Sequence, residues 1–381
     1  MKAVLSLLLF AFFSSGFSQS FVVTNTTVFD GEKVIENTSV LVENGTIIKI
    51  ANDIQVKTQQ IDGTGKFLMP SLTNSHVHAW SALALSEAAQ AGVLHLLDMH
   101  GMEQYQATMA QLNDSTQYAN YFYAGAAATA PEGHGTQFGF EVPTLTTPEE
   151  APGFVNDRLA AGAHYLKIIV EPWKNTLSNE TVAALIDAAH EKEIPAVVHI
   201  SKATDASYVL SENADGLVHI WWDQPMAASQ LKQLAEEKDF FIIPTLLTSV
   251  KLLGSIRKNA TEEMKLLSDE AIFAEVKKAY DAGIPILVGT DPPNAQINYG
   301  TDLYEEMKLI AEAGVPVLDV LKGATSLPAK EFRLGKTGSI QPGYRADLLL
   351  LEKNPLEDIT HINSIEKIWK HGKEVSLSNN N

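Results

Sequence analysis

The 381-residue sequence contains no cysteine. This absence excludes disulfide scaffolds, thiolate metal sites and cysteine nucleophiles. Any metal ion that the protein binds must therefore be held by nitrogen and oxygen ligands.

Basic residues are scarce as well. The 28 Lys and Arg stand against 46 Asp and Glu, which gives a formal net charge of -18. The acidic residues are spread along the chain, and this disfavours the basic surface that nucleic-acid phosphates require. We therefore expect a small-molecule substrate and no nucleic-acid partner.

Long apolar runs are also missing, since no segment is uniformly apolar over the roughly 20 residues that a membrane-spanning helix needs. The first 19 residues carry Lys2, an apolar run from Ala3 to Phe13 and then small residues, a pattern typical of a signal peptide. The alternative is a buried N-terminal strand. Without a cysteine at the cleavage site a lipoprotein anchor is excluded, so the sequence predicts export to the periplasm or medium with no membrane anchor.

The pattern of apolar and polar residues divides the remaining chain into three parts. Residues 20–66 and 337–381 contain short alternating strands broken by turn residues, and these two chain ends predict one small β-sandwich domain. Residues 67–336 alternate short apolar runs with amphipathic helical patterns, which is typical of an α/β fold with parallel strands. The eight runs are Phe67 to Leu72, Val93 to Asp98, Tyr121 to Ala126, Tyr165 to Glu171, Ala196 to Ile200, Gly216 to Ile220, Phe240 to Leu246 and Pro285 to Asp291.

Eight such units predict a (β/α)8 TIM-type barrel. An open doubly wound sheet is the alternative, because periodicity alone does not show closure. No glycine-rich phosphate loop follows the first run, which removes the usual reason for that alternative.

Barrel enzymes place their chemistry at the C-terminal ends of the strands, and few polar residues stand there. His76 and His78 follow the first run, and their spacing lets both side chains point the same way in an extended segment. His199 and His219 lie in otherwise apolar runs, where an unpaired imidazole is costly to bury. Asp291 ends the eighth run. Each of these histidines, taken alone, could be a hydrogen-bonded residue of the core. Together the set favours a metal site, because imidazole and carboxylate suit first-row metals.

Lys167 lies inside the apolar run YLKIIV, although lysine is seldom buried without a partner. One interpretation is a long side chain that reaches solvent. The other is a carbamate, formed when carbon dioxide adds to the amine, whose two oxygens bridge two metals.

The motifs PSLTNSHVH, YLKII, VVHIS, GLVHI and VGTD, in this order, resemble the amidohydrolase superfamily. The resemblance covers nearly the whole mature chain, since the tail from GATSLPAKEF to GYRADLLLLEKNPLED is similar as well. Within the superfamily the sequence looks most like the branch of Xaa-Pro dipeptidases and imidazolonepropionase-related proteins. It departs from that pattern at Leu97, where an arginine is common, and in ISKATD after His199.

This resemblance implies a binuclear centre with two divalent metal ions, for which zinc is suitable and manganese, iron or cobalt stay open. One metal would be held by His76, His78 and Asp291, the other by His199 and His219, and carboxylated Lys167 would bridge both. A hydroxide bridging the metals would attack the substrate carbonyl, and Asp291 would act as the catalytic proton shuttle. His134, in the loop PEGHGTQFG, would touch substrate, with a solvent-exposed loop histidine as the alternative. Paired barrels among relatives make a homodimer plausible.

The sequence therefore predicts a metal-dependent hydrolase of amide-type carbon-nitrogen bonds in a dipeptide, an N-acyl amino acid or a cyclic amide. One alternative is a single-metal deaminase, which normally carries a glutamate shortly after the fifth-run histidine, whereas Ile200, Ser201 and Lys202 follow His199 here. Another is a non-catalytic binding protein on the same scaffold.

Overall fold

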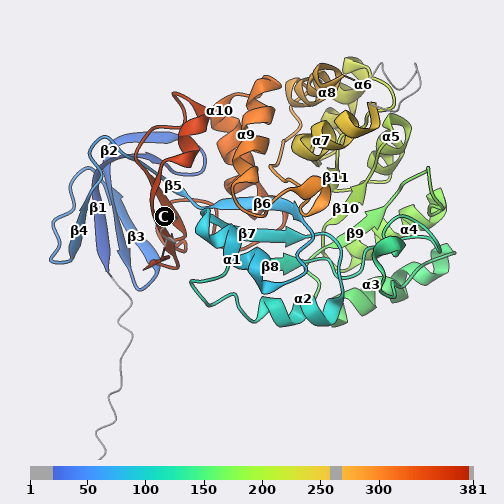
Figure 1. The fold of residues 1–381 in the computed structure, drawn as a ribbon, viewed down its shortest axis with the longest axis horizontal. Coiled ribbons are helices and arrows are strands. Elements are labelled where there is room, and N and C mark those ends of the chain that lie inside the picture. The colour runs from blue at the N-terminus through green and yellow to red at the C-terminus, as the bar shows by residue number, and fades with distance from the viewer. Residues whose placement is uncertain (1–19, 258–267, 377–381) are drawn as a thin grey trace, which may run out of the picture.

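A computed structural model describes residues 20–257 and 268–376 of the chain (Figure 1). The predicted signal peptide lies outside the described residues. Among those that are described, no helix is both long enough and apolar enough to cross a membrane.

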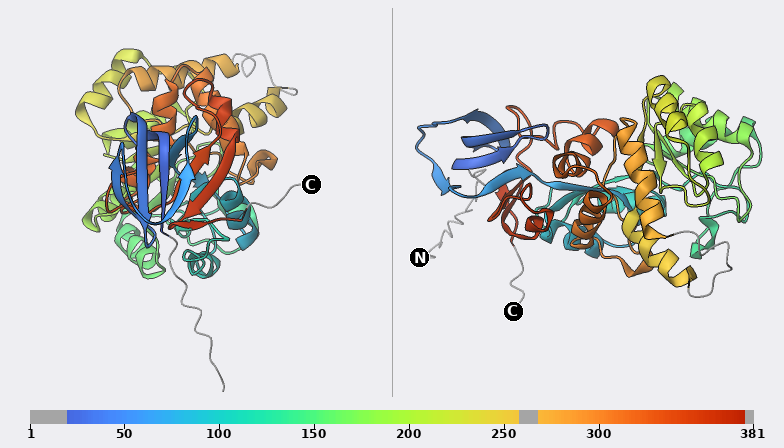
Figure 2. Two further views of the ribbon diagram at one scale, coloured as in Figure 1. Left: turned by 90° about the vertical axis from the view of Figure 1, so that its left-hand side faces the viewer. Right: turned by 90° about the horizontal axis from the view of Figure 1, so that it is seen from above.

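The two chain ends pair in one eight-stranded sheet, which lies at one end of the molecule (Figure 2). The strand order is β15-β14-β13-β5-β1-β2-β3, and β4 pairs with β1. The N-terminal strands are β1 (Phe21–Phe29), β2 (Val34–Glu43), β3 (Thr46–Ala51), β4 (Gln59–Asp62) and β5 (Phe67–Pro70), and the C-terminal ones are β13 (Leu348–Leu351), β14 (Ile365–Lys370) and β15 (Lys373–Glu374). The pairing thus joins both chain ends in one sheet, and within the described residues it does not divide the strands into the two sheets of a sandwich.

The first predicted barrel run, Phe67 to Leu72, is wrong in its bounds. Its residues up to Pro70 form β5, which pairs with β13 of the small sheet, and the first strand of the parallel region is β6 (Leu72–Val77). The partner changes at one peptide unit, because Ser71 N donates to Asp347 O and Leu72 N donates to Gly92 O. A continuous apolar segment gives no sequence signal for such a change of partner.

The central region contains two sheets of parallel strands. The first has the order β6-β7-β8, with β7 (Val93–Asp98) and β8 (Asn120–Tyr123); the second has the order β12-β11-β10-β9, with β9 (Leu166–Ile169), β10 (Ala196–His199), β11 (Gly216–Val218) and β12 (Phe241–Ile243). The eighth predicted run forms only an isolated bridge between Ile286 and Ile242. The described residues therefore form an α/β fold with short parallel strands, and not one continuous eight-stranded ladder.

The ladder is interrupted between the two sheets at Gly125. Its φ of 78° lies in the left-handed region, which glycine adopts without steric cost. β8 ends at Tyr123, and pairing resumes at an isolated parallel bridge between Ala128 and Ile168. On the opposite side, Ser75 N donates to Val288 O at 2.9 Å and links β6 to the eighth run.

Helices follow the strands and cover the central region. In Figure 1, α1 and α2 lie against β7 and β8. The helices are α1 (Ala82–Gln90), α2 (Glu103–Ala110), α3 (Ala151–Ala160), α4 (Asn179–Glu191), α5 (Ala203–Ser211), α6 (Ala228–Glu237), α7 (Leu246–Arg257), α8 (Asp269–Asp281), α9 (Asp302–Glu312), α10 (Val317–Gly323) and α11 (Ser326–Glu331).

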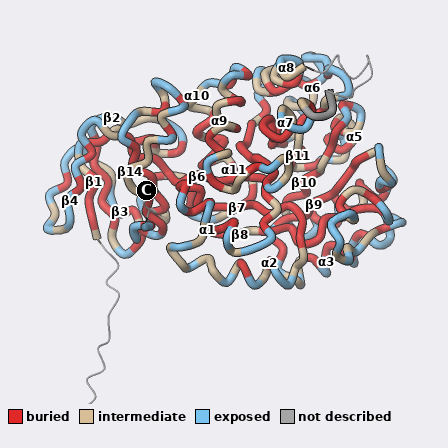
Figure 3. Tube along the Cα trace, viewed as in Figure 1, coloured by how far each residue is buried: buried red, intermediate tan, exposed pale blue. Residues whose placement is uncertain are grey.

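α4 illustrates why these segments are helical. Ser178 Oγ accepts a hydrogen bond from Thr181 N and caps the first turn. Val182, Leu185 and Ile186 recur at helical spacing and are buried against the core. Figure 3 shows the same division throughout the molecule, with buried strands inside and exposed outer helix faces.

Candidate metal centre

A cavity of about 510 Å³ opens at the C-terminal ends of the parallel strands. All six predicted metal ligands and the predicted substrate contact line it; these are His76, His78, Lys167, His199, His219, Asp291 and His134. The sequence positions were up to 215 residues apart, so their convergence is a result of the fold.

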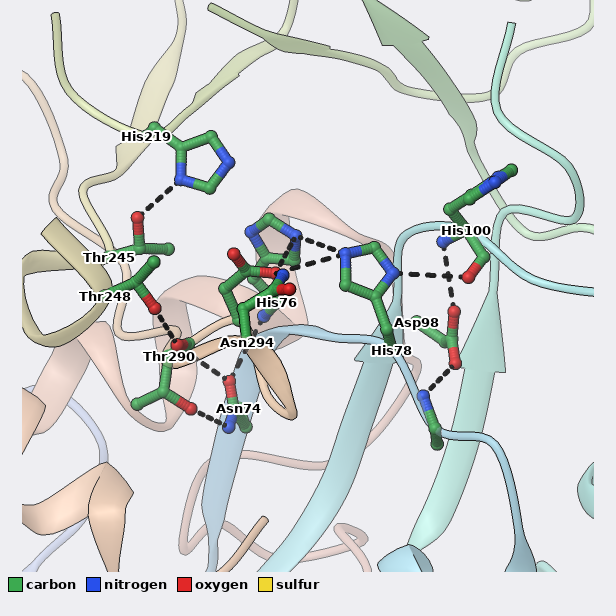
Figure 4. Close-up of polar contacts among 12 residues, drawn as sticks. Asn74, His76, His78, Asp98, His100, His219, Thr245, Thr248, Thr290 and Asn294 are labelled. Carbon is green, nitrogen blue, oxygen red and sulfur yellow. Dashed lines mark hydrogen bonds and ion pairs between the residues drawn. The ribbon is translucent and has the colours of Figure 1, made fainter. Parts of the chain in front are cut away.

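His76 and His78 lie side by side in this cavity (Figure 4), and Asp291 completes a tight group with them. Asp291 Oδ1 lies 3.1 Å from His78 Nε2 and 3.3 Å from His76 Nε2, and the two imidazole nitrogens are 3.2 Å apart. His78 Nδ1 donates to the carbonyl oxygen of His100 at 3.2 Å. His78 Nε2 therefore faces Asp291 and is the nitrogen of this ring that could bind a metal.

His219 and His199 lie beside this group. The ring centroid of His219 is 5.1 Å from that of His76 and 4.6 Å from that of His199. Thr245 Oγ1 donates to Pro244 O, so it accepts from His219 Nδ1 at 2.6 Å. This hydrogen bond fixes the tautomer of His219 and leaves its Nε2 as the free ligand atom.

Lys167 on β9 is only 2% exposed, and its Nζ has no hydrogen-bond partner among the described residues. Burial lowers the pKa of Lys167 to about 7, because the apolar surroundings disfavour the charged ammonium. A large fraction of this amine is therefore neutral at physiological pH and able to act as a nucleophile.

Burial also lowers the pKa values of His76, His199 and His219 well below the usual range. The three imidazoles are therefore neutral at physiological pH, the form in which histidine binds metals.

The side chains fit a metal centre. The possible ligand atoms of His76, His219 and Asp291 all lie within 4.8 Å of one another. Within the part of the chain that the structure describes, the buried atoms His76 Nδ1 and Lys167 Nζ lack hydrogen-bond partners, and such an atom is costly unless a further group satisfies it. The nitrogen and oxygen donor set suits zinc and other first-row divalent ions.

The model of the amidohydrolase family matches residues 67–375 of this chain. The chain belongs to the amidohydrolase family. Its curated relatives include a 5-methylthioadenosine/S-adenosylhomocysteine deaminase of Carboxydothermus hydrogenoformans, 23% identical over 87% of this chain and 84% of the relative. An ochratoxinase of Aspergillus niger is 22% identical over 90% of this chain and 84% of the relative.

Solved structures share this amidohydrolase fold. A Xaa-Pro dipeptidase with bound methionine superposes with a TM-score of 0.80 at 19% identity, covering 93% of this chain and 99% of that one. The A. niger ochratoxinase superposes with a TM-score of 0.78 at 19% identity, covering 93% of this chain and 95% of that one.

Two cavity residues of this amidohydrolase were missed by sequence reasoning. Glu171 is buried after β9, and its Oε2 accepts from His199 Nε2 at 2.9 Å while Oε1 accepts from Ser201 Oγ at 2.7 Å. His100 is buried after β7, and its carbonyl orients His78. Both residues follow strands, so the rule of looking at C-terminal strand ends could have found them.

Hydrogen bonds outside the ligand set connect the first and last predicted units of the central region (Figure 4). Asn74 Nδ2 donates to Thr290 Oγ1 at 2.7 Å, and Asn74 Oδ1 accepts from Thr290 N at 3.1 Å and from His76 N at 3.2 Å. These bonds place Asp291 next to His76. His219 and Asp291 adopt left-handed backbone with φ of 70° and 61°, a strain that the surrounding hydrogen bonds must compensate.

His134 lies in the loop after β8, and the structure places it at the cavity wall. Its ring centroid is 4.9 Å from that of His199 and 5.5 Å from that of Trp173. Thr129 Oγ1 donates to its carbonyl oxygen at 2.8 Å and holds the loop. The loop position thus brings an imidazole next to the predicted second metal group.

Proposed function

We propose that this protein is a metal-dependent hydrolase that cleaves an amide-type carbon-nitrogen bond in a small molecule. The observation that carries this proposal is Lys167, buried in the cavity without a hydrogen-bond partner among the described residues and surrounded by four histidines and Asp291. Membership of the amidohydrolase family supports hydrolysis at carbon-nitrogen bonds.

Two divalent ions, zinc by the chemistry of the donors, would be held by the predicted ligands. His76, His78 and Asp291 would bind one ion, and His199 and His219 the other. Lys167 would bridge them after its neutral amine attacks carbon dioxide and loses a proton to form a carbamate. When bound, the ions would polarise the substrate carbonyl and lower the pKa of water towards neutrality.

Asp291 would move the proton during hydrolysis. Its Oδ1 accepts from Asn294 Nδ2 at 2.9 Å, which orients the carboxylate in the cavity. The carboxylate would take a proton from the attacking water and deliver it to the departing nitrogen, so that an amide becomes a carboxylic acid and an amine. His134 would contact the substrate from the cavity wall beside His199.

The substrate class within this reaction is a dipeptide, an N-acyl amino acid or a cyclic amide. The fold shared with a Xaa-Pro dipeptidase and the similarity to an ochratoxinase support these three types of substrate, and they favour none of the three over the others.

Metal analysis and a substrate screen test the proposal. We expect about two ions per chain after purification and release of an amine from at least one member of a panel of dipeptides, N-acyl amino acids and lactams. A chain that binds no metal and hydrolyses none of them would instead be the binding protein considered above.

Deamination is the second candidate function, because several relatives carry deaminase names and Glu171 places a carboxylate beside His199. That carboxylate could serve proton transfer to a leaving ammonia. Ammonia release from nucleosides with about one bound ion per chain would favour this reaction, whereas amine release with two ions favours amide hydrolysis.

We further propose that the two parallel sheets belong to one (β/α)8 barrel, a view supported by the hydrogen bond from Ser75 N to Val288 O and by the bridge between Ala128 and Ile168. The small domain, predicted as residues 20–66 and 337–381, would extend to Pro70, because β5 pairs with β1 and β13 of its sheet. Export after removal of residues 1–19 is proposed from the sequence alone, and N-terminal sequencing of the protein from its host tests it. A homodimer is tested by its mass in solution.

A further inference from the structure

The outer wall of the cavity carries two large aromatic side chains that nothing above assigns. Phe138 and Trp173 both line the cavity, and they are 40% and 59% exposed. They come from different loops, since Phe138 follows β8 and Trp173 follows β9. Exposed aromatic surface that rims a cavity is typical of a ligand-binding site.

Each aromatic residue is connected by ring contacts to one of the two predicted metal groups. On one side Trp173 packs against His134 with 5.5 Å between centroids, and His134 packs 4.9 Å from His199. On the other side Phe138 packs 5.9 Å from His100, and His100 packs 6.4 Å from His78. Two series of rings therefore run from the predicted metal groups to the mouth.

The loop that carries Phe138 is held in place by His100. Its Nδ1 accepts from Ala127 N at 2.9 Å, so Nε2 carries the proton and donates to Gly135 O at 3.1 Å. Because the loop is fixed before a ligand arrives, Phe138 can bind a flat group with little loss of conformational entropy.

The wall also contains the apolar residues Ile169, Ile200, Trp222, Leu252 and Leu253, beside polar ones such as Ser249 and Asn294. Aliphatic residues would suit any apolar group. The two exposed rings add a preference for aromatic groups, because aromatic pairs attract each other beyond what the burial of their area contributes.

We propose that Phe138 and Trp173 form an aromatic-ring subsite, and that the substrate is an amide bearing an aromatic ring bound at the mouth while its carbonyl lies at the metal centre. This inference rests on the proposed amide hydrolysis for the reacting bond, but the subsite itself is defined by the two rings. It narrows the substrate from any amide to an aryl-bearing one.

A matched pair of compounds tests the subsite. N-acetylbenzylamine and N-acetyl(cyclohexylmethyl)amine have the same scissile bond and nearly the same size, but only the first has a planar π-system. For the metal-loaded wild-type protein we expect kcat/KM about fivefold higher for the benzyl compound, in line with the energy of one aromatic pair. The Phe138→Leu and Trp173→Leu variants should each reduce this ratio, and the double variant should reduce it most.

Tyr105→Leu is the control, because Tyr105 is 54% exposed but does not line the cavity, and it should leave the ratio unchanged. Equal kcat/KM values for the two compounds in the wild type, or a ratio unchanged in the double variant, would overturn the subsite. If neither compound is hydrolysed, calorimetric Kd values give the same ratio. A benzyl preference in Kd alone would support the subsite and count against amide hydrolysis, whereas equal or undetectable binding would overturn the subsite.

Discussion

The protein buries two clusters of histidine, aspartate and lysine, and they differ in what the lysine contacts. At the junction of the small sheet, His95 Nε2 lies 3.0 Å from Thr337 Oγ1 and 3.5 Å from Asp347 Oδ2. The nearby Lys370 Nζ donates to the carbonyl oxygens of Ser115 and Tyr118 at 2.8 and 2.6 Å. In the cavity, Lys167 Nζ contacts no acceptor among the described residues.

Burial alone does not separate these clusters. It lowers the pKa of Lys370 to about 8 and that of Lys167 to about 7, so both amines are perturbed in the same direction. The two lysines differ in their hydrogen bonds. The Lys370 ammonium donates to two backbone carbonyls and stabilises the junction, whereas the Lys167 amine has no acceptor among the described residues and is available for chemistry. For these two lysines, the shifted pKa therefore indicates function only where the amine also lacks a hydrogen-bond partner among the described residues.

The largest expected effect comes from Lys167→Met. Loss of the bridging group should weaken metal binding by more than about a hundredfold, beyond what removal of a ligand's hydrogen-bond partner costs, and should abolish turnover. Because the pKa of Lys167 is about 7, recovery of metal-free protein with bicarbonate and zinc should be faster at pH 8 than at pH 6.

Metal content and activity after dialysis measure both effects. Intact-mass loss of one carbon dioxide on acid treatment would identify the carbamate directly. If Lys167→Met kept full activity and two bound ions, Lys167 would have no role in metal binding, and it would not differ in function from Lys370.

Asp291→Asn should lower kcat by about 10²–10⁴-fold, the usual contribution of a positioned acid-base group, and change KM much less. Asp347→Asn at the junction is the matched control, since it removes a buried carboxylate beside a histidine with no expected effect on kcat per folded molecule. Steady-state kinetics on an amide found in the screen measure both variants. Near-wild-type kcat in Asp291→Asn would exclude it as the proton shuttle.

Glu171→Gln tests whether the carboxylate beside His199 supports metal binding. Glutamine keeps an acceptor for His199 Nε2 but removes the charge, so affinity for the second ion should fall about 10- to 100-fold. Ser201→Ala leaves the carboxylate and removes one of its hydrogen bonds, and we expect a smaller loss. Titration of metal-free protein with chelator-buffered zinc resolves the two affinities, and equal values in all three proteins would contradict this role.

The smallest effect on activity is expected from Lys370→Met. It should lower the free energy of unfolding by about 1–3 kcal/mol, because two buried carbonyls lose their donor. Between pH 8 and 10.5 the unfolded chain holds a proton that folded Lys370 has released, so stability of the wild type should rise with pH there. The variant should show a smaller rise, because Lys167, whose pKa is also lowered, still contributes to it. Urea unfolding at several pH values measures the difference. A loss of kcat per folded molecule would mean that the junction also serves catalysis.

Much of the site could be predicted because its polar residues lie in otherwise apolar segments of the sequence. Lys167 and the histidines interrupt apolar runs, and an extended His-x-His segment needs no tertiary information to align its side chains. Glu171 was missed because a carboxylate at the end of a strand reads as an ordinary exposed residue. Its significance comes from His199 and Ser201, which only the fold brings near.

The strand bounds were harder to predict than the strand positions. Val93–Asp98 is the same in sequence and structure, since an apolar run flanked by Gly92 and a helix has only one interpretation. The segment from Phe67 to Val77 was divided incorrectly, because its switch between sheets depends on backbone partners more than 200 residues away. The eighth run failed as a strand for a similar reason, as its backbone groups bond to several different neighbours.

The bonds between Asn74 and Thr290 also constrain the order of folding. In the sequence, His76 lies near the start of the central region and Asp291 near its end. The first half of the chain therefore cannot assemble the ligand set by itself. Contacts between residues this far apart form late, since a long loop must close before they repay its entropy. A growing chain that still lacks Asp291 therefore offers an ion an incomplete ligand set, and we expect tight metal binding only when folding is complete.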